Sequence, residues 1–129
     1  PSVGEATILD DPRAFRVMVR NAVFEWVQRL ARQRGYDVLV EGSPNFESVP
    51  DLVEALAPYW EEHDEIILDA GARSSSLFTY DHATGRVTQI LSDPDDTNEW
   101  RIEADVDRDA SAEAGRAVLR LDVVGPARS

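Results

Sequence analysis

Apolar residues recur at spacings of three and four along residues 11–35, DPRAFRVMVRNAVFEWVQRLARQRG, and this spacing predicts one long amphipathic helix. The apolar stripe consists of Phe15, Val19, Ala22, Val23, Trp26, Val27 and Leu30. Asp11 can cap the free N–H groups at the start, Pro12 suits the first helical position, and Gly35 suits a left-handed end. A stripe of this width needs a partner surface.

A second helical pattern covers residues 48–63, SVPDLVEALAPYWEEH. Ser48 is suited to cap this helix, and Asp51 favours its first turn. Pro58 lies inside the pattern, where it removes one backbone hydrogen bond and clashes with the preceding turn. We therefore expect the segment to kink or to split into two short helices near Ala57.

The segment between the two helices, residues 36–46, is rich in turn residues and indicates a connector. Residues 37–40 within it favour a short strand. After residue 65 the helical period gives way to a short apolar run at 66–68 and then to a loop of small residues at 70–75. These changes mark the start of the β part of the chain.

Alternating apolar and polar residues then predict strands. Residues 77–91 indicate a hairpin closed by HATG, and residues 100–107 and 117–123 each alternate, with DASAEAG (109–115) as the turn between them. Helices followed by four or five such strands predict an α+β fold, with the helices on the apolar face of an antiparallel meander sheet. A curved sheet around the first helix, as in folds resembling nuclear transport factor 2 or cystatin, is the version we expect.

The length of 129 residues, 43% of them apolar, fits one domain with a real core. We place this domain at residues 11–124, between an N-terminal linker (1–10) and a C-terminal tail (125–129). Because the chain opens with proline, we expect a piece of a longer protein. The three tryptophans, Trp26, Trp60 and Trp100, are expected in the core rather than as platforms for a ligand.

The charge is strongly negative, with a formal net charge of −12 that is unevenly distributed. Residues 1–35 carry a net +2 and residues 36–129 a net −14. An acidic body repels phosphate backbones, so direct nucleic-acid binding is not expected. All 13 basic residues are arginine, which excludes catalytic lysines, and the absence of cysteine excludes disulfides and thiolate metal sites. No segment approaches the ~20 apolar residues of a membrane span, and we expect a cytoplasmic protein.

The candidates for acid–base chemistry are the two histidines of the chain or a buried carboxylate. His63 lies in the acidic run YWEEHDEI and could be a base held by a carboxylate, although a helix-terminal histidine favoured by the helix dipole is the interpretation we prefer. His82 is expected to be solvated in the hairpin turn. Two acidic runs, 93–99 and 105–113, lack the glycine and glutamate of a calcium loop. We therefore assign no catalytic residue, metal ligand or cofactor.

Arg13, Arg16 and Arg20 lie three and four residues apart, on one side of the first helix. Guanidinium groups in such a row can bind phosphate or an acidic protein surface, which makes them candidate partner-binding residues. The alternative is a solvated helix face paired with the acidic body of the same chain. Unchanged binding after Arg16→Glu plus Arg20→Glu would exclude the partner-binding hypothesis.

Several segments together resemble one known family, the C-terminal domain of uncharacterised function on actinobacterial superfamily 2 helicases of the DEAD/DEAH type. The segments are PRAFRVMVRNAVF (12–24), EEHDEI (61–66), ARS (72–74), VTQILSDPDDTNEW (87–100) and EADVDRDASAEAGRAVLRL (103–121). The resemblance covers most of the chain and departs from the family's pattern at residues 35–48.

The resemblance implies a tail domain attached to an ATP-driven nucleic-acid motor, with RNA or DNA as the substrate left open. No catalytic residue comes with it, and the chain lacks the phosphate-binding motif of such a motor. We therefore expect a non-catalytic accessory domain that docks on its helicase core or on another protein, in an undetermined oligomeric state. The alternative is a small-molecule-binding domain or enzyme, similar to nuclear transport factor 2, with a pocket between the first helix and the sheet.

Overall fold

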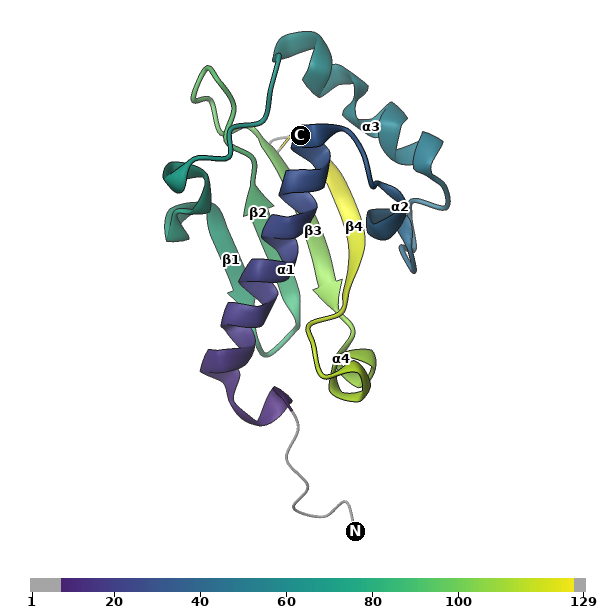
Figure 1. Ribbon diagram of the computed structural model, residues 1–129, viewed down its shortest axis with the longest axis vertical. Helices are drawn as coiled ribbons and strands as arrows, with labels where there is room; N and C mark the ends of the chain where they lie inside the picture. The colour runs from purple at the N-terminus through teal and green to yellow at the C-terminus, as the bar shows by residue number, and fades with distance from the viewer. Residues whose placement is uncertain (1–7, 127–129) are drawn as a thin grey trace.

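The computed structural model describes residues 8–126, in which helix α1 crosses one face of a four-stranded antiparallel sheet (Figure 1). The sheet is a meander of order β1-β2-β3-β4. The strands are β1 (Phe78–Asp81), β2 (Arg86–Ile90), β3 (Trp100–Val106) and β4 (Leu119–Pro126). The helices are α1 (Pro12–Arg32), α2 (Asp37–Val40), α3 (Val49–Glu62) and α4 (Arg108–Ala114), with 3-10 turns at Ile8–Asp10, Ala70–Arg73 and Ser75–Leu77. The predicted α+β fold with a meander sheet is confirmed, with four strands.

Helix α1 begins and ends much as its sequence predicts. The Asp11 carboxylate accepts a hydrogen bond from the backbone N–H of Ala14 at 3.1 Å, which satisfies one of the free donors of the first turn. The helix ends at Arg32, three residues before the predicted end at Gly35, because Gln33 already adopts the left-handed conformation with φ 55°. The side chains that it buries are Phe15, Val19, Val23, Phe24, Trp26, Val27 and Leu30.

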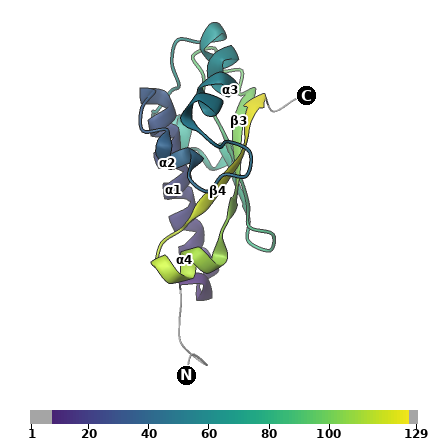
Figure 2. The ribbon, with the colours of Figure 1, turned by 90° about the vertical axis from the view of Figure 1, so that its right-hand side faces the viewer.

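The buried stripe of α1 packs on the inner face of the sheet, where α2 also lies (Figure 2). Fully buried side chains from the strands, among them Val87, Ile102 and Leu121, meet Phe15 and Val19 in one core. Close packing of this kind leaves the space between α1 and the sheet filled. The core therefore fills the space directly beneath α1, and in the part of the chain that the structure describes the hollow of the predicted alternative is found only beside α1, toward β4.

The tryptophans follow the prediction in part. Trp26 and Trp100 are buried in the core. Trp60 is only half-buried and packs its ring edge against Tyr59, with ring centroids 5.1 Å apart. Tyr59 also contacts Trp100 edge-on, so it joins the two indoles. The ring contacts of Trp60 and Trp100 with Tyr59 indicate that these tryptophans serve in packing.

The short strand predicted at residues 37–40 is wrong, because this segment is helix α2. The backbone N–H groups of Leu39 and Val40 both donate to the carbonyl of Tyr36, at 3.0 and 3.2 Å. Strand preference of the sequence DVLV is overridden by burial, since one turn of helix places Leu39 and Tyr36 in the core. Gly42, with φ 72°, follows and permits the reversal into the connector.

The turn predicted at DASAEAG (109–115) is also wrong, because helix α4 occupies it. Asp107 caps the helix by accepting from the N–H of Ala110 at 3.0 Å, and Gly115 ends it with φ 71°. The buried Ser111 hydroxyl accepts from the N–H of Val118 at 2.8 Å and so ties the helix to the start of β4. The alanines of this segment favour a helix, and the caps at its two ends together with its packing stabilise the short helix that forms.

The split of the second helix predicted near Ala57 does not occur, because α3 continues through Pro58. Its N-terminus carries a capping box in which Ser48 and Asp51 satisfy each other's backbone donors, as the sequence suggests. Leu52, Leu56 and Tyr59 are fully buried along one side. This burial outweighs the single backbone hydrogen bond that the proline removes.

The segment at 66–75 forms neither a strand nor a plain loop. Ile66 is buried, and the N–H of Ile67 donates to the carbonyl of Ser92 at 2.8 Å. Two 3-10 turns then lead into β1. Of the predicted linker and tail, residues 1–7 and 127–129 lie outside the described residues; Ile8–Asp10 form a 3-10 turn whose apolar side chains pack on the core, and β4 runs to Pro126.

The outer face of the sheet is organised by Arg86. Its guanidinium binds the carboxylates of Glu103 at 2.7 Å, Asp105 at 3.0 Å and Asp122 at 2.7 Å. Strand β4 contains a β-bulge next to this cluster. Glu103 pairs with Val123, whereas the next residue of β3 pairs with Leu121. The bulge makes Asp122 an extra residue and turns Val124, not Val123, toward the core, contrary to the alternation of the sequence.

Candidate functional site

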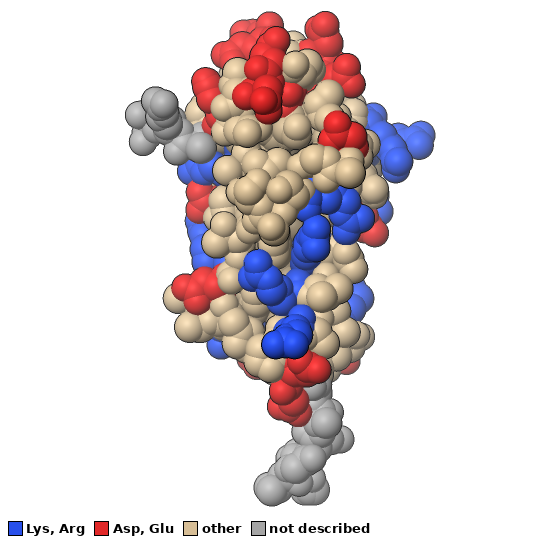
Figure 3. Space-filling model, turned by 90° about the vertical axis from the view of Figure 1, so that its left-hand side faces the viewer, with Lys and Arg blue, Asp and Glu red and all other residues tan. Residues whose placement is uncertain are grey.

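The arginines predicted to bind a partner lie on the side of α1 that faces β1. Figure 3 shows basic side chains along this side of the molecule, with acidic side chains gathered at the top. Arg13 and Arg16 are exposed and Arg20 is half-buried. The exposed Arg73, from the 3-10 turn before β1, joins them through its contacts with Arg20. We call these four residues the arginine face.

Two of the three predicted arginines, Arg16 and Arg20, are engaged within the chain. The Arg16 guanidinium donates to the carbonyl of Tyr80 at 3.3 Å and lies 5.1 Å from the ring centre of Phe78. The Arg20 guanidinium donates to the carbonyl of Arg73 at 2.6 Å. These contacts fasten α1 to β1 and to the 3-10 turn that precedes it. Charge reversal of Arg16 and Arg20 would therefore disturb the fold as well as any partner.

Arg73 was not foreseen as part of this surface. Its guanidinium lies 4.7 Å from the ring centre of Phe24 and donates to the side-chain oxygen of Asn21 at 2.8 Å. A residue more than fifty positions away in the sequence reaches α1 only through the course of the chain, and no local spacing signals it. Arg13 makes no such contact with the part of the chain that the structure describes, which leaves it available at the surface.

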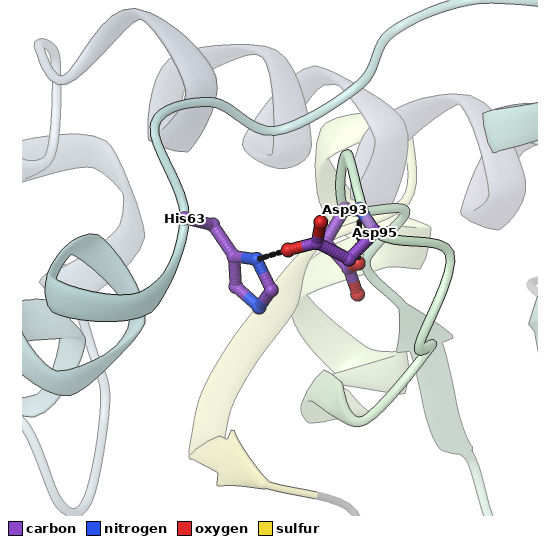
Figure 4. A group of neighbouring side chains, drawn as sticks. All are labelled: His63, Asp93 and Asp95. Atoms are coloured by element: carbon purple, nitrogen blue, oxygen red, sulfur yellow. Dashed lines mark hydrogen bonds and ion pairs between the residues drawn. The ribbon is translucent and has the colours of Figure 1, made fainter.

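His63 pairs with an aspartate, as one of the two sequence hypotheses supposed (Figure 4). Its ring Nδ1 lies 3.1 Å from Oδ2 of Asp95, and its side chain is 5% exposed. The preferred alternative holds as well, since His63 is the C-cap of α3 and its N–H donates to the carbonyl of Tyr59 at 2.9 Å. The carboxylate partner comes from the loop after β2, not from the acidic neighbours in sequence.

Asp93 organises the loop that supplies Asp95. Its carboxylate accepts hydrogen bonds from the backbone N–H groups of Asp95, Thr97 and Asn98 and from the Thr97 hydroxyl, at 2.6 to 3.1 Å. Burial opposes its ionised form, but the hydrogen bonds outweigh burial and hold the pKa of Asp93 below its ordinary value. The acidic run 93–99 is thus a structured turn.

His63, Asp93 and Asp95 form the one group of ligand-type side chains close enough to hold a metal ion within residues 8–126, with ligand atoms within 4.8 Å of one another. Both oxygens of Asp93 already accept hydrogen bonds from the loop. The outer nitrogen of His63, Nε2, lies 3.9 Å from the Glu62 carboxylate, and the ring packs on Tyr59 with centres 4.8 Å apart. The arrangement fixes a loop to a helix end and offers little room for a substrate.

Tyr59 completes this buried cluster. Its hydroxyl donates to the carbonyl of Glu65 at 2.7 Å. Burial, and then the nearby carboxylates of Asp93 and Glu65, raise the pKa of Tyr59 far above its ordinary value. The phenol therefore stays neutral and serves as a hydrogen-bond donor. His82, expected in solvent, is half-buried, with Nδ1 3.0 Å from the hydroxyl of Tyr80.

A large open groove lies on the other side of α1, between α1, α2, α4 and β4, and its volume is about 1100 Å³. All four elements can be located in Figure 2. Apolar and small side chains form its floor: Met18, Ala22, Trp26, Ala117 and Leu119. Val38 of α2, which is 36% exposed, stands at its edge. We call it the acidic groove because of the charges around it.

The charges around the acidic groove are mostly unpaired. Asp107 and Arg120 bind each other at 3.0 Å, and the backbone N–H of Ala110 together with Arg120 lowers the pKa of Asp107. The exposed charged side chains that remain along the groove are Glu25, Glu41, Asp109, Glu113 and Arg116. Only Glu25 among these carboxylates has a partner within the described residues, Arg29 at 3.6 Å. Four carboxylates thus face one guanidinium.

None of the helices described between residues 8 and 126 has the length and apolarity needed to cross a membrane.

The whole sequence was also compared with known proteins. Neither the curated proteins nor the solved structures contain a match. The family described as a domain of unknown function, DUF3516, matches residues 2–124, which include α1, the whole sheet apart from the end of β4, and both charged surfaces. The chain therefore belongs to the DUF3516 family.

Proposed function

We propose that this domain is a non-catalytic accessory module that docks on a partner protein, the ATP-dependent helicase motor to which it is attached, and regulates or positions that motor. The family match fits this proposal, because it covers nearly the whole chain as one unit. The link to a helicase comes from the resemblance of residues 12–121 to the C-terminal domains of such motors.

The acidic groove is the observation that carries the proposal. It is open, about 1100 Å³ in volume, apolar along its floor and charged around its edge. Apolar surface rimmed by charge is typical of protein interaction sites. Small-molecule sites are more enclosed, since they bury most of the surface of their ligand.

The competing function is a ligand pocket or active site between α1 and the sheet, and the space directly between α1 and the middle of the sheet gives it little support. That space holds the fully buried Phe15, Val19, Val87 and Ile102. The histidine–carboxylate pair His63 with Asp95 joins the end of α3 to a loop; the His63 side chain packs on Tyr59 and is 5% exposed, whereas the Asp95 side chain is 67% exposed. A general base must reach a substrate proton within about 3 Å, and a side chain with 5% exposure is poorly placed to do so.

ATPase and unwinding rates of the whole protein, with and without residues 12–124, test the proposal. We expect both rates, or their dependence on nucleic acid, to change when the domain is removed, and to recover when the separate 129-residue chain is added back. Recovery would show that the domain acts by docking. Equal rates in both forms would count against an accessory function.

A further inference from the structure

The acidic groove has the shape and charge to receive a helix. We propose that its occupant is a basic amphipathic helix of the motor protein, with apolar residues on one side and Lys or Arg along both edges. The inference deepens the proposed docking function and rests on it. The observations that carry it are the helical ridge on the floor, the engaged carbonyls of β4 and the excess of unpaired carboxylates.

The floor of the groove presents a ridge that suits another helix. Met18 and Ala22, both half-buried, lie four residues apart on α1, and the buried Trp26 continues their row. Such i, i+4 rows are the ridges that pack into the grooves of a neighbouring helix. The row spans eight residues, about 12 Å at 1.5 Å per residue, which corresponds to two turns of an incoming helix. Small side chains at Ala22 and Ala117 leave room for close approach.

An extended strand is the less suitable occupant, because two backbone carbonyls of β4 are already engaged by the connector. The Ser43 hydroxyl donates to the carbonyl of Leu121 at 2.6 Å, and the Asn45 side chain donates to the carbonyl of Asp122 at 2.9 Å. A peptide that adds to a sheet needs such backbone groups free. Because the connector between α2 and α3 occupies these carbonyls, we expect a partner to bind the apolar floor of the groove rather than the edge of β4.

The charges specify a basic partner. Glu25 and Glu41 stand on the α1 and α2 sides, while Asp109 and Glu113 stand on α4. Arg116 is the one guanidinium of the groove that is not paired to a carboxylate of the described residues. Complementary charge of this kind speeds association and fixes orientation more than it adds affinity. A helix with positive charge along both edges meets carboxylates on both sides of the floor.

The test uses the 129-residue chain and two synthetic peptides in titration calorimetry. Both peptides are amphipathic helices with leucine on one side; one carries lysine and the other glutamate on the polar side. We expect the lysine peptide to bind and to weaken with added salt, and the glutamate peptide to bind at least about tenfold more weakly. Equal binding of the two peptides would overturn the inference.

Two pairs of variants locate the binding. Val38→Arg places a charge at the edge of the groove, and Val53→Arg is its control because Val53 is an exposed valine, 51%, that lies on α3 outside the groove. We expect a loss of at least about tenfold in affinity from the first and none from the second. Glu41→Arg with Glu113→Arg should weaken the lysine peptide and strengthen the glutamate peptide. All these positions are exposed, so circular dichroism should show unchanged folding.

The same variants in the whole protein separate the two proposals. If removal of residues 12–124 changes ATPase rate and Val38→Arg reproduces that change, both hold. If the removal changes the rate and Val38→Arg does not, docking stands and the groove is the wrong site. If the removal has no effect, the proposed function fails. Sedimentation of the chain alone adds one outcome: self-association abolished by Val38→Arg would make a second copy the occupant and overturn the inference.

Discussion

The loop at residues 93–99 and the edge of the acidic groove both concentrate carboxylates, and the two regions use them differently. In the loop, Asp93 accepts four hydrogen bonds and Asp95 pairs with His63. Along the groove, Glu41, Asp109 and Glu113 have no partner within the described residues. The acidic run 105–113, which supplies Asp109 and Glu113, looks much like the run 93–99 in the sequence. Whether a charge is already bound within the fold is what separates a structural carboxylate from one available to a partner.

The arginines divide in the same way. Arg16 and Arg20 donate to backbone carbonyls near the edge of the sheet, whereas Arg13 remains at the surface. The sequence presents these three arginines as one candidate surface. In the structure two of them are engaged within the chain and one is available to a partner. Predictions that contrast engaged with available charges test this division directly.

The largest effect is expected at Asp93. Asp93→Ala leaves three backbone N–H groups and one hydroxyl without their acceptor, so the free energy of unfolding should fall by about 2–3 kcal/mol. Urea unfolding measures the change. Glu99→Ala, an exposed acid of the same loop, should alter the free energy of unfolding by less than about 0.5 kcal/mol. Similar losses in the two variants would break the contrast.

Acidification should weaken the fold through the same engaged carboxylates. The pKa values of Asp93, Glu103 and Asp107 are lowered in the folded chain, so their stabilising contribution is complete above the ordinary carboxyl pKa of about 4 and is lost as pH falls below it. The melting temperature should be nearly constant from about pH 7 to 5 and should then fall. If the melting temperature of Asp93→Asn falls less steeply with pH, part of the pH dependence belongs to Asp93.

A smaller effect is expected at the arginine face. Arg16→Ala removes a hydrogen bond to Tyr80 and the contact with the Phe78 ring, which should lower the free energy of unfolding by about 1 kcal/mol. Arg13→Ala, one turn earlier on the same helix, should leave it unchanged. Thermal unfolding of the two variants side by side decides the question, and an equal loss from Arg13→Ala would show that Arg13 is engaged after all.

The smallest effect on stability is expected along the groove. Glu113→Gln removes an exposed carboxylate without a partner in the described residues, so its effect on the free energy of unfolding should stay within about 0.5 kcal/mol. Removal of one negative charge from a chain with a net charge of −12 relieves repulsion, so any small change should raise the free energy of unfolding. A clear destabilisation in urea unfolding would place Glu113 among the structural carboxylates.

Much of the fold follows from periodicity in the sequence. The apolar stripe of α1, the hairpin at 77–91 and the strand that begins at Trp100 all lie where their patterns predict. The failures are short elements whose local preference is weak. At Asp37–Val40 burial overrides a strand-forming composition, and at Arg108–Ala114 two caps make a helix of a predicted turn.

The candidate surfaces were harder to predict, because they depend on contacts between distant residues. Spacing placed Arg13, Arg16 and Arg20 on one side of a helix, but only the course of the chain shows that β1 passes beneath Arg16. The partner of His63 is 32 positions away. The acidic groove is bordered by α2 and α4, the two helices that the sequence did not reveal, and so it had no signal of its own.

The carbonyls engaged at the margins of the sheet have a consequence for the behaviour of the chain in concentrated solution. A sheet with bare outer strands can recruit further strands and grow into insoluble fibrils. Here Arg16 engages a carbonyl near the first margin, and Ser43 and Asn45 engage two at the last. The bulge at Asp122 adds a local twist that a flat stack could not accommodate. Addition of a strand at Leu121 and Asp122 should therefore require prior displacement of the connector at 43–45.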